Sequence, residues 1–105
     1  MKYEKMVRAL FHKAGGKKLS GPVKLYVTAL YGIPKSASAE RRTKMDLCEI
    51  LPQKKPDLDN VVKIVMDGLN GAAYDDDKQV VGLTAVKAYD YEPRVIVQVM
   101  EVNNE

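Results

Sequence analysis

Two aspartates beside a proline form the stretch of this sequence best suited to chemistry. Asp57 and Asp59 follow Pro56, whose ring fixes its own φ and biases the preceding residue toward an extended backbone. If the backbone stays extended through Leu58, both carboxylates leave the same side of the chain, with Cα atoms about 6.5 Å apart, and Leu58 points into a core. Carboxylate oxygens are the ligands that magnesium prefers. The pair therefore predicts a magnesium-type cation site.

A second acidic cluster, at residues 75–77, comes directly before an apolar run that predicts a strand. Residues 59–69, between the clusters, carry apolar side chains at helical spacing, and Asp59 is a suitable N-cap for that helix. Lys63 lies four residues after Asp59, so its ammonium can reach the carboxylates at the helix start. A helix and a strand that each begin with acidic groups could bring those groups together in space.

These residues resemble the motif of the RusA family of Holliday-junction resolvases. The sequence reads Pro56-Asp57-x-Asp59-Asn60-x-x-Lys63, then Asp67-Gly-Leu-Asn-Gly, then Tyr74-x-Asp76-Asp77-x-Gln79-Val80-Val81. The similarity extends over about residues 20–102 and is strongest over 55–81. An isolated Asp-x-Asp pair is common, whereas this pair followed by Asn, Lys and Asp-Asp-x-Gln is specific.

The resemblance implies three catalytic carboxylates that bind Mg²⁺, or Mn²⁺ in its place: Asp57, Asp59 and Asp77. It also implies that Lys63 is their catalytic basic partner, with Asp76 and Asn60 as candidates for groups that support the ligands. A cation held by carboxylates can supply a nucleophilic water, neutralise charge in the transition state and assist the leaving oxygen. The expected activity is therefore that of a magnesium-dependent, structure-selective endodeoxyribonuclease.

The resemblance further implies a homodimer that resolves four-way junctions by paired nicks in DNA recombination and repair. A junction has two equivalent strands to cut, and a twofold dimer presents two equivalent sites. Two alternatives stay open: a DNA- or junction-binding protein whose cleavage activity has decayed, and a non-nuclease domain with a structural cation site. Taken separately, the two acidic clusters are also typical of a helix cap and an acidic turn.

Composition and charge agree with a nucleic-acid partner. The chain has 105 residues, of which 46% are apolar and 30% charged, as expected for one globular domain over 1–105. Residues 1–55 carry 13 Lys/Arg and 4 Asp/Glu, whereas residues 56–105 carry 4 and 10. A basic half suits phosphates and an acidic half suits a metal, although a mixed solvated surface would also fit.

The densest basic patch lies shortly before the acidic motif. Ser38 is a suitable N-cap for a short helix that reaches about Cys48 and carries a basic cluster: Arg41, Arg42 and Lys44. Lys54 and Lys55 lie in the loop that leads to the motif. We expect all five cations to contact DNA phosphates, the alternative for the helix being a solvated face.

The single cysteine and single histidine limit the kinds of metal site that the sequence allows and bear on the cellular compartment. Cys48 and His12 are the single residues of their types, which excludes an intramolecular disulfide and a cysteine-based metal site. No apolar run approaches the roughly 20 residues of a membrane span, and no secretory signal is present. A cytoplasmic protein is expected, and the resemblance implies a bacterial or phage-encoded one.

The remaining pattern predicts an α/β (α+β) fold: a small, mixed, largely antiparallel sheet of three or more strands, backed by two main helices. Helical spacing covers residues 2–14, and alternation predicts strands over 23–31, 79–91 and 94–102, the last two as an antiparallel hairpin. The resemblance implies a further strand before the first helix, and this sequence starts at that helix. That edge strand is then absent, supplied from elsewhere, or lost by shortening.

Overall fold

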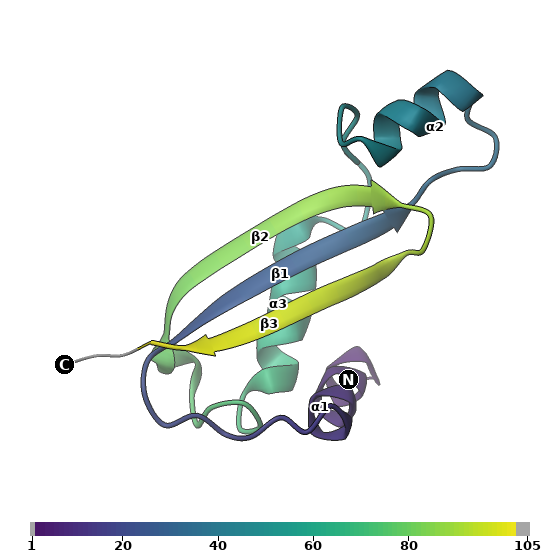
Figure 1. The fold of residues 1–105 in the computed structure, drawn as a ribbon. Helices are drawn as coiled ribbons and strands as arrows, with labels where there is room; N and C mark the ends of the chain where they lie inside the picture. The colour runs from purple at the N-terminus through teal and green to yellow at the C-terminus, as the bar shows by residue number, and fades with distance from the viewer. Residues whose placement is uncertain (1, 103–105) are drawn as a thin grey trace.

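The computed structural model describes residues 2–102 as three helices and a three-stranded sheet. The elements are α1 (Lys2–Lys13), β1 (Val23–Gly32), α2 (Ala39–Asp46), α3 (Leu58–Leu69), the 3₁₀ turn η1 (Asp77–Gln79), β2 (Val80–Asp90) and β3 (Arg94–Glu101). Figure 1 shows α3 lying across one face of the sheet, with α1 near the lower end of α3. Helix α2 lies beyond the end of the sheet at which β1 and β2 finish. The expected α+β fold is confirmed. None of these helices is long and apolar enough to cross a membrane.

The sheet has the order β2-β1-β3, with β2 parallel and β3 antiparallel to the central strand β1. The predicted hairpin between the last two strands is therefore wrong. Residues 91–93 instead carry the chain across the end of β1, where Ile33 N–H donates to the Asp90 carbonyl at 3.1 Å. Burial fits this order: every second residue of β1 is buried, whereas every residue of β2 and β3 is half-buried or exposed.

Alternate residues of β1 form the middle of the core, as the period-two pattern predicts. These inward residues are Val23, Leu25, Val27, Ala29 and Tyr31, none more than 9% exposed. The helical stripe of α3, with Val61, Val65 and Leu69, belongs to the same cluster. Because both elements are fixed by the same apolar contacts, the two ends of α3 are held at defined places along the sheet.

Gly68 provides the close contact between α3 and α1. A Cβ at this position would lie 2.7 Å from Val7 Cβ and 2.8 Å from the Glu4 carbonyl oxygen. We predict that Gly68→Ala lowers the free energy of unfolding by about 1 kcal/mol or more, because overpacking of this kind costs about 1–3 kcal/mol. Urea unfolding checks the sign. Helix propensity alone would raise stability by about 1 kcal/mol, so a stabilised variant would contradict the contact.

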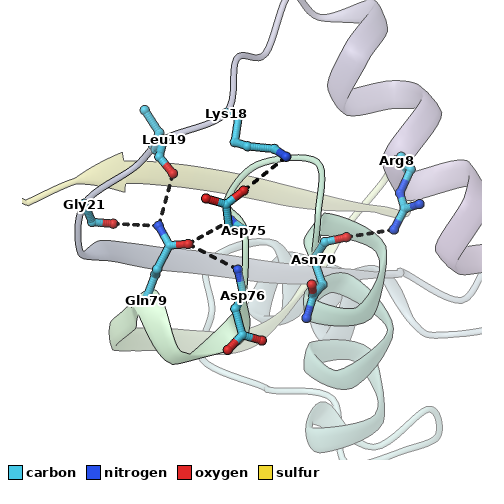
Figure 2. Close-up of polar contacts among 8 residues, drawn as sticks. All are labelled: Arg8, Lys18, Leu19, Gly21, Asn70, Asp75, Asp76 and Gln79. Atoms are coloured by element: carbon cyan, nitrogen blue, oxygen red, sulfur yellow. Dashed lines mark hydrogen bonds and ion pairs between the residues drawn. The ribbon is translucent and has the colours of Figure 1, made fainter.

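Arg8 ties α1 to the C-terminal end of α3. Its guanidinium donates to the Gly68 carbonyl at 3.3 Å and to the Asn70 carbonyl at 2.8 Å, the latter drawn in Figure 2. Cations are favourable at a helix C-terminus, where carbonyls lack intrahelical partners. The helix ends at Leu69 with Asn70 as its C-cap, and Gly71 follows with φ +81°. This fixes the start of the loop that leads to the second acidic cluster.

Candidate active site

The first acidic pair lies at the N-terminal end of α3, in a different geometry from the one expected. Asp57 is the N-cap, with φ −67° and ψ 149°, and Leu58 is the first helical residue. The prediction of Asp59 as N-cap, with an extended Leu58 between two parallel carboxylates, is therefore wrong. Leu58 is three residues before Val61 and packs against the same core, which draws it into the helix. Both carboxylates are nevertheless exposed, and Asp57 forms no capping hydrogen bond.

The loop that carries Asp57 is held by the C-terminal ends of β1 and β2. The Tyr31 hydroxyl donates to the Pro56 carbonyl, and Lys87 Nζ donates to the Lys54 carbonyl at 2.8 Å. Lys87 Nζ also lies 4.8 Å from the centre of the Tyr31 ring. Sequence reasoning assigned no role to Tyr31 or Lys87, since neither belongs to the motif. They place the first acidic pair at the end of the sheet where β1 and β2 finish.

The predicted DNA-binding cations gather near this same end. Helix α2 lies beyond it (Figure 1) and carries Arg41, Arg42 and Lys44. Ser38 caps α2 as predicted, accepting from the Arg41 N–H at 3.2 Å. Lys54 Nζ lies 5.6 Å from the centre of the Tyr89 ring, and the neighbouring Lys55 is exposed. The end of the sheet that holds the first acidic pair therefore also presents positive charge.

The second acidic cluster lies at the opposite end of the sheet. Asp77 opens the 3₁₀ turn η1, directly before Val80, which pairs with Val23 at the start of β1. Asp76 is extended, with φ −155° and ψ 149°. Residues 75–77 therefore do not enter β2 as one extended segment.

Asp77 differs from its neighbours in its surroundings. Its Oδ1 and the hydroxyl of the fully buried Tyr74 are both buried and interact with each other, although neither forms a hydrogen bond of normal geometry within residues 2–102. Burial and then the Asp77 carboxylate raise the pKa of the Tyr74 phenol above its ordinary value, so it stays protonated. Asp75 is exposed and forms an ion pair with Lys18 at 3.2 Å. Asp77 is therefore held against the protonated Tyr74 phenol, whereas Asp75 is paired at the surface.

Residues on the exposed side of α3 complete the predicted set. Lys63 and Asn60 are both exposed, and Asn60 N–H donates to Asp59 Oδ1 at 3.0 Å. Within residues 2–102, Lys63 and Asp67 form no ion pair, although the four-residue spacing permits one. Asp67 instead lies near enough to Tyr74 to contribute to its raised pKa. Lys63 therefore keeps its ammonium available at the N-terminal half of α3.

The two acidic clusters do not meet within one chain. They lie at opposite ends of α3 (Figure 1), and a helix of 12 residues is about 18 Å long. Among residues 2–102, no three His, Cys, Asp or Glu side chains come together in a group able to hold a metal ion. The expectation that Asp57, Asp59 and Asp77 of one chain come together is therefore wrong. The role of each carboxylate stays a prediction.

Comparison with known proteins indicates a family for this sequence. The sequence profile of the family described as Endodeoxyribonuclease RusA matches residues 1–100. An uncharacterized protein of Bacillus subtilis (strain 168), YqaN, is 42% identical to the chain over 87 residues, which cover 81% of the chain and 61% of YqaN. The chain thus spans about three fifths of the length of this curated relative. The family match includes both acidic clusters and the basic residues that precede them.

Proposed function

Because the chain belongs to the RusA endodeoxyribonuclease family, we propose that it resolves four-way DNA junctions by Mg²⁺-dependent nicking, in recombination or repair. The observation that carries this proposal is the gathering of opposite charges at one end of the sheet. Asp57 and Asp59 are exposed there beside the loop of Lys54 and Lys55, with α2 beyond. A cation at the carboxylates and cations on the surrounding surface would act on the same phosphate backbone.

The three predicted carboxylate ligands can form one magnesium site only when two copies of the chain are considered. Asp77 is the half-buried carboxylate of its cluster and lies beside Tyr74, yet it is about a helix length from the other pair. We propose a homodimer in which Asp77 of one copy completes the site of Asp57 and Asp59 of the other. A twofold axis then makes two equivalent sites, one for each strand to be cut. When bound, the ion would polarise the phosphate and lower the pKa of the attacking water.

A synthetic four-way junction tests the proposal. With Mg²⁺, the protein is expected to nick two opposing strands symmetrically, and with EDTA it is expected to bind without nicking. Binding without nicking in both conditions would favour a DNA-binding protein that has lost cleavage. Absence of both binding and nicking would leave a domain with a structural cation site.

Lys63→Ala is predicted to slow nicking about a hundredfold or more, the usual scale for loss of one electrostatic stabiliser. Lys63 lies one helical turn after Asp59 and is exposed, so its ammonium can reach a phosphate held by the acidic pair. Stability should change by less than about 0.5 kcal/mol, as for other surface substitutions. Single-turnover nicking and urea unfolding measure the two effects. Nicking near the wild-type rate would remove Lys63 from the reaction.

The aspartates of the second cluster are predicted to differ in their effects. Asp77→Asn should be inactive, because Asp77 is the carboxylate of this cluster that we propose completes the metal site. Asp75→Asn should remain largely active, since its carboxylate is exposed and paired with Lys18. Asp76→Asn is expected to be intermediate through its effect on its neighbour. The same nicking assay ranks the three variants, and an inactive Asp75→Asn beside an active Asp77→Asn would shift the site by two residues.

A further inference from the structure

The side chain of Gln79 forms four hydrogen bonds, all to the backbone (Figure 2). Its Nε2 donates to the Leu19 carbonyl at 3.1 Å and to the Gly21 carbonyl at 3.0 Å. Its Oε1 accepts from the Asp75 N–H at 2.8 Å and from the Asp76 N–H at 3.1 Å. One side chain thus joins the segment before β1 to the acidic loop before β2.

Only a carboxamide of this length can form this set of bonds. The group has two N–H donors and one oxygen with two lone pairs, and all four are used here. The orientation of the amide is also fixed, since two carbonyls need donors and two N–H groups need an acceptor. Glutamate has no donor when ionised, leucine has neither donor nor acceptor, and asparagine is one methylene shorter.

The bonds of Gln79 close a small framework around Asp77. Leu19 N–H donates to the Ala73 carbonyl at 2.8 Å, and Lys18 pairs with Asp75, so the segment before β1 is also attached to this loop at two further residues. Gln79 also lies in the same 3₁₀ turn as Asp77. The backbone on both sides of Asp77 is therefore held by one side chain.

We propose that Gln79 is a positioning residue that sets the orientation of the Asp77 carboxylate toward a divalent cation. The inference rests on the proposed function, and it assigns to Gln79 no contact with DNA or metal. A carboxylate ligand must be held firmly to bind a small cation well, and loss of a supporting group costs about 10–100-fold in metal affinity or activity. Because the amides of Asp75 and Asp76 depend on Oε1, loss of the carboxamide frees the turn that carries Asp77.

The test compares Gln79→Glu and Gln79→Leu with Gln98→Glu, a matched change at an exposed position of β3. Three readouts are used: Mn²⁺ binding by electron paramagnetic resonance, nicking as a function of Mg²⁺ concentration, and amide hydrogen exchange. Both Gln79 variants should bind Mn²⁺ about 10–100-fold more weakly and need correspondingly more Mg²⁺, with junction affinity in EDTA unchanged. Exchange should accelerate at Asp75 and Asp76 and stay unchanged in α3. Gln98→Glu should match the wild type throughout.

Unchanged Mn²⁺ binding with accelerated exchange would overturn the proposal and leave Gln79 a purely structural residue. Failure of the proposed function is distinguishable, because a wild-type protein that does not nick still reports on Gln79 through Mn²⁺ binding and exchange. If neither variant folds, hydrogen exchange of the wild-type protein tests the framework. The Asp75 and Asp76 amides must then exchange slowly although both residues are exposed. Fast exchange there would exclude the framework.

Discussion

Asp57→Asn is expected to abolish junction nicking while junction binding stays the same or becomes tighter. A metal ion contributes several kcal/mol of transition-state stabilisation, so its loss should slow nicking by roughly three orders of magnitude. Removal of a negative charge beside phosphates favours DNA binding. The fold should persist, since Asp57 forms no capping hydrogen bond and asparagine is itself a good N-cap.

The matched control is Asp46→Asn, which makes the same change of charge at an exposed position in the last turn of α2. It should nick at the wild-type rate, because Asp46 does not belong to either acidic cluster. Gel shifts in EDTA measure binding, and single-turnover reactions in Mg²⁺ measure nicking. Loss of binding in a folded Asp57→Asn protein would show that the carboxylate is structural.

Much of the local structure was predictable, because it is encoded in nearby residues. The alternation from Val23 to Tyr31 predicts the buried strand, the apolar stripe from Val61 predicts α3, and Ser38 predicts the start of α2. Each signal depends on one face that must be buried or on one unpaired N–H that must be capped. The motif likewise indicated the family.

Strand order and turn conformation were not predictable in the same way, since they depend on contacts distant in sequence. The position of β1 between β2 and β3 depends on how the two outer strands and the helices cover it in the assembled sheet. The 3₁₀ turn at Asp77 depends on carbonyls some 60 residues away, at Leu19 and Gly21. Gln79 was visible as part of the motif, but its role was not.

The separation of the acidic clusters, by contrast, follows from the helix that the sequence predicts between them. Asp57 and the 75–77 cluster flank one apolar helix, and a helix of 12 residues separates its ends by about 18 Å. To join them within one chain, the loop after α3 would have to run back along the length of the helix. Instead, Gly71 N–H donates to the Tyr74 carbonyl, and the chain turns directly into β2. A complete site within one chain is therefore the part of the prediction that fails, and a twofold dimer is the simplest arrangement that would complete the site.

Mixed dimers of Asp57→Asn and Asp77→Asn are therefore expected to regain activity that neither variant has alone. In a mixed dimer, one site combines both substitutions, and the other combines Asp57 of one chain with Asp77 of its neighbour. Random exchange makes about half of the dimers mixed, so about a quarter of all sites should be active. Each mixed dimer should nick one strand of a junction, whereas the wild type nicks two.

Co-expression with two affinity tags isolates the mixed dimer, and light scattering verifies that it has twice the mass of the chain. Its nicking rate per dimer should be about half that of the wild type, with single nicks as the product. If each chain held its own complete site, both chains of the mixed dimer would be defective and no activity would return. A mixed dimer without activity, or a monomer that makes paired nicks, would therefore exclude a site shared between two copies.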